Sequence, residues 1–596
     1  MTGHELAARV LDALLREDYG GLSLRVRSGP CGPFLDLPSC PGRTGLEVPL
    51  EPDRFLADFR VRRSFRSRIG LDHVLAVLAA VSHPLDRAGV AAFAAECEQA
   101  LAALRLRERH LPGVHARLAR LRHADPEAAL GTRGQLGYEA LAAAMPHPAY
   151  PTAQCRLDFT DEDSLRYAPE YLPEFELNWV ALPAAALVRA GDGQPLWWPA
   201  PADVGLPDSL AATHDLVPVH PLTARGPLAA ALAEAGLDRS RPAGEPGTSA
   251  RPDAARAKAV IAPGRHLTVI PTLSTRTVAV AADPGAHLKL PLPTSTLGLR
   301  NRRSIVPATL ADGALVRGVV AAAIRADGQL GRLLLADESR YAHAGHPYLG
   351  YLLRRLPPGI EGSRIVPVAA LLAPEPQAAQ ARGVPERVSG SPLVIGELAR
   401  QPFGGSLEAL LDGYLSLLFD IHVRLFVRYG IAMEAHQQNA AVVIDETGMR
   451  LLVRDFDGAL IQHARLAAAL GTAAPPRHAF ADPRLITESD DALADVFITI
   501  TVHLCAGALA FGLAERGIAP LDDLLGLIRR RLTDALDRHS GSPQAALLRA
   551  RLFDAERLPG KSMVTAGTLV GKARTRASDI NKFYGTSGPN YLRGRQ

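Results

Sequence analysis

The strongest constraint on the fold is the stretch from residue 405 to residue 458, where an apolar segment runs into a polar cluster and a hairpin pattern. Residues 405–428, GSLEALLDGYLSLLFDIHVRLFVR, are apolar on most sides, which predicts a buried helix. Two apolar runs then flank the polar turn Asp445–Gly448, a pattern that predicts a β-hairpin. A buried helix that leads directly into a hairpin requires a core built from both helices and strands.

Polar side chains gather at both ends of this hairpin. If the segment before it is extended, Glu434, His436 and Gln438 point to one side, and Asn439 follows at the mouth of the hairpin. The returning strand brings Asp455 back beside that mouth. Magnesium takes Asn and Asp oxygens, usually with one or two carboxylates, and leaves its other positions to phosphate and water. The pattern therefore favours a metal–triphosphate site over a solvated hairpin with an Arg–Asp pair.

A second polar group occupies residues 271–303. Strand-like runs there carry hydroxyl and basic side chains, and a turn is expected at residues 283–285. Thr296 and Arg300 are four residues apart and would share a face if their segment is helical. The arginine fork suits carboxylate or phosphate, so the density of Ser and Thr beside Arg and Lys favours an anion site over ordinary surface charge. The candidates are Ser274, Arg276, Lys289, Thr296 and Arg300.

The length of the chain, 596 residues, predicts several units rather than one domain. The expected fold class is α+β, a multi-lobed cradle with the active site between its second and third lobes. These lobes are a helical N-terminal lobe (1–135), a central antiparallel-sheet lobe (136–392) and a mainly helical C-terminal lobe that contains the hairpin (393–596).

Local patterns add further expectations. Apolar runs such as LTVI and HLKLPL predict an antiparallel sheet in the central lobe. LVIGELA, residues 393–399, is expected to be a strand, whereas residues 489–557 are expected to be helical, with Ser489 as the N-cap. The Pro- and Gly-rich stretches 238–256 and 373–392 are expected to be loops.

Composition excludes several classes of protein. The net charge of +4 comes from scattered arginines, which argues against a nucleic-acid partner. Five cysteines in so long a chain form neither a disulfide framework nor a zinc spacing. The N-terminus lacks the apolar core of a signal peptide, and no run is expected to reach the roughly 20 apolar residues that span a bilayer. A cytoplasmic protein with no membrane partner is therefore expected.

Several motifs resemble one known family. They are Ser-x-Arg-Thr from Ser274, the strand with Lys289, Thr-x-x-x-Arg from Thr296, and Gly-Ile-Ala-x-Glu-Ala-His-x-Gln-Asn followed by Arg-Asp-Phe. The stretches LRYAPEYLPEFELNWVAL and PVHPLTARG add to the pattern. Together they resemble the siderophore synthetases that work independently of nonribosomal peptide synthetases, the aerobactin-synthetase-like IucA/IucC family, from about residue 137 to the C-terminus.

The resemblance implies an enzyme that uses ATP and Mg²⁺ to adenylate a carboxylate such as citrate. The acyl group then passes to an amine or alcohol to give an amide or ester, and such enzymes are often homodimers. By position, His436, Arg300 and Lys289 would be catalytic. The residues implied to contact ATP are Ser274, Arg276, Thr277, Lys289, Gln438 and Asn439; those for magnesium are Glu434 and Asp455; those for the carboxylate are Thr296, Arg300 and His436.

Two segments depart from the family pattern. Where the family usually shows Gly-His-Pro-x-His-Pro and then Lys-x-Arg-x-Gly, this chain has PHPAYP at 146–151 and QCRLD at 154–158. After His220 and Pro221, the usual Trp-Gln is Leu-Thr. These changes affect the expected substrate more than the expected reaction.

Two alternatives compete with this interpretation. An aminoglycoside-kinase-like phosphotransferase also holds magnesium with an Asn and an Asp, but it needs an aspartate base just before the Asn, where this chain has Gln437 and Gln438. A catalytically silent anion-binding protein is favoured by the altered segment near residue 150. The intact Lys289, Asn439 and Asp455 weigh against it.

Overall fold

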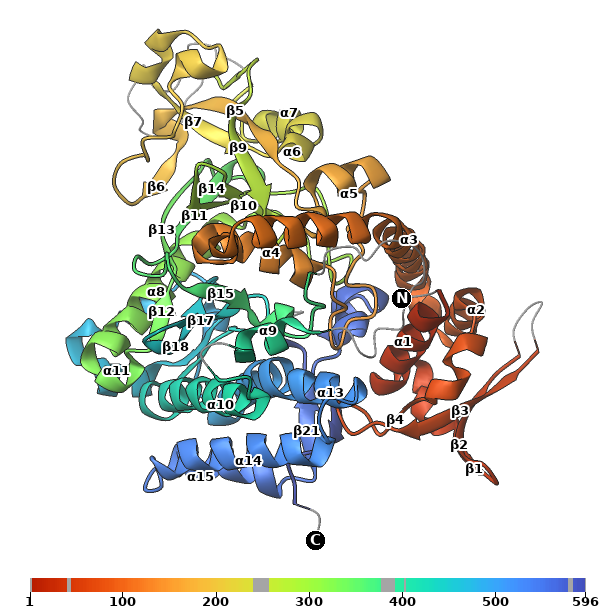
Figure 1. Cartoon of the computed structure of the whole chain (residues 1–596). Coiled ribbons are helices and arrows are strands. Elements are labelled where there is room, and N and C mark those ends of the chain that lie inside the picture. Colours follow the sequence, from red (N-terminus) through yellow and green to blue (C-terminus); the bar gives the residue numbers. More distant parts are fainter. Residues whose placement is uncertain are drawn as a thin grey trace.

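The protein is an α+β structure, as predicted. Figure 1 shows a strand-rich part at one end, a mainly helical C-terminal part at the other, and the first helices at the side. Of the two Pro- and Gly-rich stretches expected to be loops, residues 239–256 and 377–391 lie outside the described residues. The structure is a computed structural model, and it describes residues 3–39, 44–238, 257–376, 392–400, 403–576 and 582–594.

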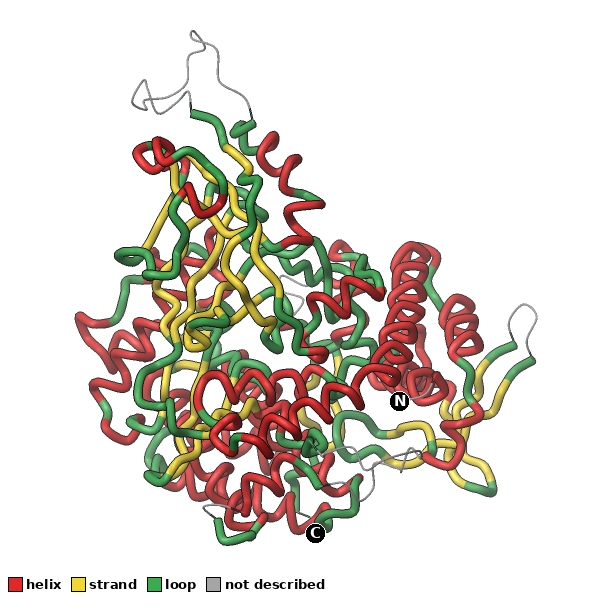
Figure 2. Tube along the Cα trace, turned by 45° about the horizontal axis from the view of Figure 1, so that its top comes forward, coloured by secondary structure: helices red, strands yellow, loops and turns green. Residues whose placement is uncertain are grey.

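A nine-stranded antiparallel sheet forms the central part, which confirms the predicted sheet (Figure 2). Side chains such as Leu177, Trp179, Val278 and Leu288 are fully buried in one cluster on this sheet. Strand β8 (Val260–Ile261) pairs with β5 at its side. The order is β6 (Val188–Ala190), β13 (Asp337–His343), β14 (Gly350–Arg355), β11 (Asp283–Lys289), β10 (Thr277–Val280), β9 (His266–Pro271), β5 (Phe175–Pro183), β7 (His214–Val219).

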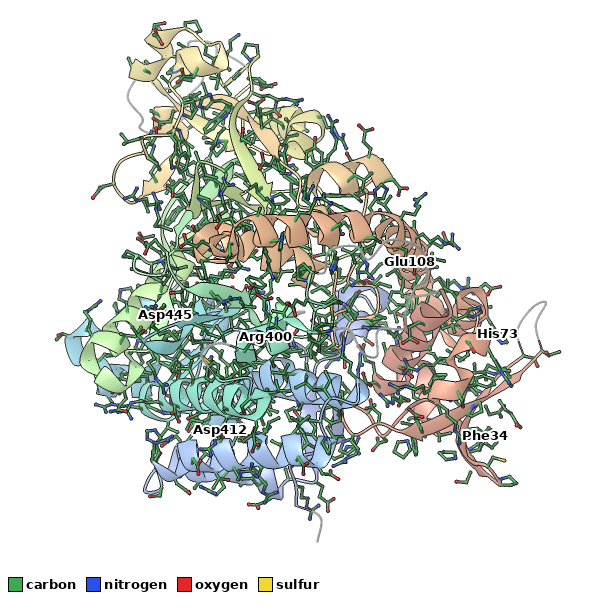
Figure 3. All side chains as sticks on the ribbon, in the orientation of Figure 1. Phe34, His73, Glu108, Arg400, Asp412 and Asp445 are labelled. Carbon is green, nitrogen blue, oxygen red and sulfur yellow. The ribbon has the colours of Figure 1, made fainter. Side chains whose placement is uncertain are left out.

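The predicted helix and hairpin are both confirmed. Helix α10 (Leu407–Arg424) is buried on most sides and continues as a π-helical turn. In the hairpin, Asp445 lies opposite Gly448, and its carboxylate, labelled in Figure 3, accepts a hydrogen bond from Ser363 Oγ at 2.8 Å. The hairpin belongs to a four-stranded sheet with the order β12 (Leu333–Leu335), β18 (Gly448–Val453), β17 (Ala440–Asp445), β15 (Arg364–Pro367).

The expectation that residues 1–135 are mostly helical missed a four-stranded antiparallel sheet. Its first two strands, VRSG and GPFLDL, are short and contain Gly, Pro and exposed polar residues, so they lack the alternation that marks a strand. The sheet comprises β1 (Val26–Gly29), β2 (Gly32–Leu37), β3 (Leu46–Pro52) and β4 (Phe59–Val61); the neighbouring helices are α1 (Gly3–Arg16), α2 (Leu71–Val81), α3 (Arg87–Ala124) and α4 (Gly131–Ala143).

The strand expected at residues 393–399 is wrong, because this segment is helix α9 (Val394–Arg400). Its apolar residues bury one helical face, and Glu397 pairs with Arg122 and Arg364, so tertiary contacts override the strand propensity. The Ser489 N-cap is confirmed by its Oγ, which accepts a hydrogen bond from the Ala492 amide. The helices that follow are α12 (Asp490–Val496), α13 (Ala508–Glu515), α14 (Leu521–Asp537) and α15 (Pro543–Arg549).

The expectation that no run is long and apolar enough to cross a bilayer is also wrong. Helix α8 (Pro307–Ala326) and the continuous helical stretch Asp490–Glu515 both have that length and composition. The apolar window of the second is 89% buried inside the fold, and that of the first 44%. Burial in the core accounts for the apolar composition of the second helix.

Four buried histidines and one half-buried histidine link the stability of this fold to pH. Burial lowers the pKa of three of them to about 3 and of two to about 4. An unfolded histidine titrates near pH 6.5, so the native state binds fewer protons than the unfolded chain below that value. The three are His147, His220 and His287; the two are His422 and His503.

The free energy of unfolding is therefore expected to be largest above about pH 6.5 and to fall as the pH drops towards the folded pKa values, by about 1.4 kcal/mol per pH unit for each histidine. Asp12, whose pKa burial raises to about 6, has the opposite sign and offsets part of this. In urea unfolding as a function of pH, His422→Leu should flatten the slope by about one proton. The exposed His123→Gln is the control for the loss of a surface histidine.

Candidate active site

One cavity of about 620 Å³ collects most of the predicted site residues. Its walls come from the turn between β9 and β10, the loop that contains residues 296–303, the mouth of the hairpin, and the C-terminal residues Lys561, Met563, Lys572 and Lys582. Lys289 and Thr277 are buried behind this lining. The predicted residues that line the cavity are Ser274, Arg276, Thr296, Arg300, Glu434, His436, Gln438, Asn439 and Asp455.

Lys289 joins the central sheet to the end of the hairpin. It is the last residue of β11, and its Nζ donates to Asp455 Oδ1 at 2.7 Å and to Asp457 Oδ2 at 3.2 Å. Burial opposes ionisation of Asp455, but Lys289, Arg354 and Arg276 outweigh it and hold the pKa of Asp455 well below its ordinary value. The pKa of Asp457 is raised by burial and by the Asp455 charge. The pair therefore presents one firmly ionised carboxylate to the cavity.

The segment with Ser274 and Arg276 is a turn between two strands, not the strand that was expected. Thr275 has a positive φ of 64°, so this residue cannot continue a strand. Arg156 stabilises the turn from outside, because its Nε donates to Thr275 Oγ1 at 3.2 Å. Thr277 starts β10, and its hydroxyl contacts that of Ser274 at 3.1 Å. Thr277 is thus placed to orient Ser274.

Arg156 and Glu170 form a buried bidentate ion pair, with N···O distances of 2.8 and 2.6 Å. Arg156→Met is expected to lower the free energy of unfolding by about 3–5 kcal/mol, because it leaves a buried carboxylate without a partner. Adding Glu170→Leu should restore most of that loss in urea denaturation. Both variants lose the Thr275 contact. A double variant no more stable than Arg156→Met would contradict this account.

The segment with Thr296 and Arg300 is a loop, although a shared helical face was expected. Leu297 and Gly298 have positive φ angles of 55° and 111°, which a right-handed helix does not allow. The loop is fixed on the C-terminal segment: the Arg300 amide donates to Gly567 O at 3.0 Å, and its guanidinium donates to Ala566 O at 3.1 Å. Both predicted side chains nevertheless line the cavity.

Three arginines of the cavity have no carboxylate partner among the residues that the structure describes. Arg276 donates to Ser304 O, Arg300 to Ala566 O, and Arg303 to Thr296 Oγ1, all of them neutral oxygens. Burial and the neighbouring Arg276 lower the pKa of Arg303 to about 9. Guanidinium groups that gather in a cavity and form no direct ion pair provide an anion site, which carboxylate or phosphate fits with two parallel hydrogen bonds.

The polar run before the hairpin ends in a turn, not in the extended segment that was expected. The amides of Asn439 and Ala440 both donate to His436 O, so Gln438 lies within the turn. Its Nε2 donates to Leu273 O at 3.1 Å, which ties the hairpin to the Ser274 turn. Burial lowers the pKa of His436 and keeps the imidazole neutral at neutral pH. This histidine lines the cavity as a neutral acid–base group.

The two predicted magnesium ligands are already ion-paired. Glu434 Oε1 accepts from Lys561 Nζ at 3.1 Å; burial opposes its ionisation, but Lys561 and Lys582 lower its pKa overall. Within the described ranges, no group of three or more His, Cys, Asp or Glu side chains could hold a metal alone. The carboxylate oxygens of Asp455 and Asp457 still fit a magnesium ion that arrives with a nucleotide, because phosphate and water fill its other positions.

Several cavity residues were missed from the sequence, above all Arg303, His147 and the C-terminal lysines. Lysine is rare in this chain and accounts for only five of its 66 Lys and Arg residues. Lys561, Lys572 and Lys582 line the cavity, and Lys289 lies behind it. The scarcity of lysine was therefore a usable sequence signal for the site.

Of the two segments that depart from the family pattern, residues 146–158 contribute to the lining of the cavity, whereas residues 222–223 do not. Tyr150, in place of the usual histidine, is fully buried, and its hydroxyl donates to Glu96 at 2.8 Å. Gln154, in place of the usual lysine, lines the cavity. Leu222 and Thr223 are buried outside it, and Thr223 Oγ1 donates to Pro291 O at 2.6 Å. His220 next to them packs edge-on against two aromatic rings, so this second departure is structural.

The opposite wall of the cavity is apolar. It is formed by side chains between the hairpin sheet and the long C-terminal helix, including Val368, Leu372, Ile500, Leu504 and Leu509. An apolar wall beside polar turns suits a flat ring with polar edges.

Comparison with known proteins gives two family matches. Residues 137–373 match the IucA/IucC family, and residues 408–578 match the family described as ferric iron reductase FhuF-like transporter. At the sequence level, the chain is 31% identical over 136 residues to the uncharacterized protein y4xN of Sinorhizobium fredii (strain NBRC 101917 / NGR234). This match covers 22% of the chain and spans about a fifth (19%) of that protein.

Solved structures share the whole fold. The petrobactin biosynthesis protein AsbB from Bacillus anthracis str. Sterne superposes with a TM-score of 0.71 at 14% identity, over 98% of this chain and 95% of that one. ATP-bound aerobactin synthetase IucA from a hypervirulent pathotype of Klebsiella pneumoniae gives 0.66 at 15% identity, with both chains fully covered. IucC from the same source gives 0.64 at 19% identity over 92% of each chain.

Proposed function

We propose that this chain, whose residues 137–373 match the IucA/IucC family of siderophore biosynthesis, adenylates a carboxylic acid with Mg-ATP and transfers the acyl group to an amine or alcohol. A polycarboxylate such as citrate is the proposed acid. The ATP-bound state of the Klebsiella pneumoniae IucA relative supports the nucleotide assignment.

The observation that carries the proposal is the pairing of charges in the cavity. Lys289 and Asp455 form a fixed ion pair, and three guanidiniums beside it hydrogen-bond only to neutral oxygens. Adenylation requires two anions, a carboxylate and a triphosphate, to meet in one place. A cavity with several uncompensated cations lowers the cost of that encounter.

The reaction proceeds in two balanced steps. A carboxylate oxygen attacks the α-phosphorus of ATP, and the bond to the departing pyrophosphate breaks to leave an acyl adenylate. The nitrogen or oxygen of the acceptor then attacks the acyl carbon, the bond to the AMP oxygen breaks, and the acceptor loses a proton. Arg276 stabilises the charge that builds at the α-phosphate, Lys289 holds Asp455 in place from behind the lining, and neutral His436 is placed to take the proton.

The other cavity residues position the two substrates. Arg300 and Arg303, with Thr296 between them, hold the carboxylate. The apolar wall that contains Leu372 and Leu504 receives the adenine ring. Asp455 would hold the magnesium ion that accompanies ATP, and that ion would neutralise phosphate charge. Most of the catalytic work is therefore the orientation of two anions that otherwise repel each other.

Two contacts favour ligation over phosphotransfer. A phosphotransferase would need a base near the acceptor hydroxyl, and the neighbourhood before Asn439 holds Gln437 and Gln438. Gln437 donates to Leu504 O, and Gln438 donates to Leu273 O. Both side chains are thus engaged in structural hydrogen bonds, and an amide does not accept the proton.

Incubation with Mg-ATP, hydroxylamine and a panel of carboxylic acids tests the proposal. The expected result is AMP and pyrophosphate that depend on one acid, with formation of its hydroxamate. Acid-dependent ADP would indicate the phosphotransferase instead. ATP binding without turnover for every acid would indicate the silent anion-binding protein.

A further inference from the structure

Every carboxylate among the described residues that line the cavity already has a cationic partner. Asp455 and Asp457 share Lys289, with N···O distances of 2.7 and 3.2 Å. Glu434 pairs with Lys561 at 3.1 Å, and Asp482 pairs with Arg484 at 2.6 Å. An ammonium group that entered this cavity would have to displace one of these pairs to obtain a counterion.

The cations of the lining are in excess. Arg276, Arg300 and Arg303 hydrogen-bond to neutral oxygens and are assigned above to the two anions of the first step. A further ammonium, Lys572, lies on the exposed short helix α16 (Lys572–Thr575) and forms no ion pair within the part of the chain that the structure describes. Lys582 also lines the cavity, but it is not counted in this excess, because its charge contributes to the lowered pKa values of Glu434 and Asp482.

We propose that the acceptor of the second step carries a carboxylate of its own, as an amino acid does, and is not a polyamine. This inference rests on the proposed function and names the acceptor class for the same site. Lys572 pairs with the acceptor carboxylate. The second ammonium of a diamine would instead face cations, with no uncommitted carboxylate among the described residues of the lining, which is unfavourable in a partly buried site.

The same electrostatics act on the reacting amine. An amine must be neutral to attack the acyl carbon, and nearby cations lower the pKa of an amine. A nucleophile whose own carboxylate is held at Lys572 therefore presents its amine in the reactive form. The C–N bond forms as the bond between the acyl carbon and the AMP oxygen breaks, and the proton passes to His436.

Matched pairs of acceptors that differ only by the carboxylate test this proposal. They are L-serine and ethanolamine, L-2,3-diaminopropionate and ethylenediamine, L-ornithine and putrescine, and L-lysine and cadaverine. With the acid identified by the hydroxamate reaction, we expect at least about 10-fold higher kcat/KM for the carboxylated member of the pairs that react. Equal or faster reaction of the diamines and ethanolamine would overturn the proposal.

Variants of Lys572 test whether this lysine causes the preference for carboxylated acceptors. Lys572→Gln should lower the ratio of the kcat/KM for the carboxylated acceptor to that for its matched amine. Lys572→Glu should abolish or invert this preference. The fifth lysine, Lys258, is exposed and does not line the cavity, so Lys258→Gln is the matched control and should keep the ratio. A ratio that Lys572→Glu leaves unchanged would overturn the assignment. Absence of AMP formation even with hydroxylamine would instead remove the proposed function, and this inference with it.

Discussion

Asp455→Asn is expected to lower the rate of acid-dependent AMP formation by about 10³-fold, with little effect on folding. The substitution keeps the shape of the side chain but removes the charge that pairs with Lys289 Nζ at 2.7 Å. It also removes the carboxylate that faces the magnesium of the bound nucleotide. Single-turnover kinetics with saturating Mg-ATP separate this loss from a weaker affinity for ATP.

Asp457→Asn is the matched comparison, since Asp457 also contacts Lys289, at 3.2 Å. The raised pKa of Asp457 marks it as the carboxylate of this pair that ionises less readily. We therefore expect a much smaller loss, about 10-fold, in this variant. Near wild-type AMP formation in Asp455→Asn, with unchanged thermal stability, would show that ATP is placed wrongly.

Arg303→Met is expected to lower kcat/KM for the carboxylic acid by about 10²-fold while the thermal stability stays the same or rises. Arg303 is a half-buried cation with a lowered pKa and no ion-paired carboxylate among the described residues, so it costs stability until an anion binds. If Arg303 only supported the fold, its removal would lower the thermal stability and leave kcat/KM for the acid nearly unchanged. The measurements are steady-state kinetics with varied acid and thermal unfolding without ligand.

Arg302→Met provides the control from the adjacent position. Arg302 is exposed and lies outside the lining of the cavity, so its loss should change neither kcat/KM nor stability appreciably. Equal losses in the two variants would mean that Arg303 acts only through the general positive charge of the loop.

The parts of the fold that were predictable depend on short-range patterns. The hairpin around Asp445–Gly448 and the buried helix before it are encoded within about 50 consecutive residues, and both are confirmed. LVIGELA was assigned wrongly because its burial and the ion pairs of Glu397 depend on residues distant in the sequence. The N-terminal sheet was missed because its short strands lack alternation.

In the site, too, the identities of the residues were predictable from short motifs, whereas the backbone around them depends on contacts distant in the sequence. The predicted residues converge on one cavity, except that Lys289 and Thr277 lie behind its lining, yet the backbone expected around three of the segments was wrong. Ser274 and Thr296 lie in turns whose positive φ angles arise from contacts with Arg156 and with the segment 566–568. Lys561 and Arg303 were missed because only the folded chain brings them to the cavity. The scarcity of lysine is the sequence signal that would have indicated the first of these.

The acyl-adenylate mechanism is tested most directly by measuring whether an oxygen atom passes from the carboxylic acid to AMP. The acid is supplied with ¹⁸O in its carboxyl groups, together with Mg-ATP and hydroxylamine, and the AMP is analysed by mass spectrometry. If the carboxylate attacks the α-phosphorus, one ¹⁸O from the acid remains in each AMP when the acyl group is transferred. AMP without ¹⁸O, or a label that appears in inorganic phosphate with release of ADP, would contradict the acyl-adenylate mechanism.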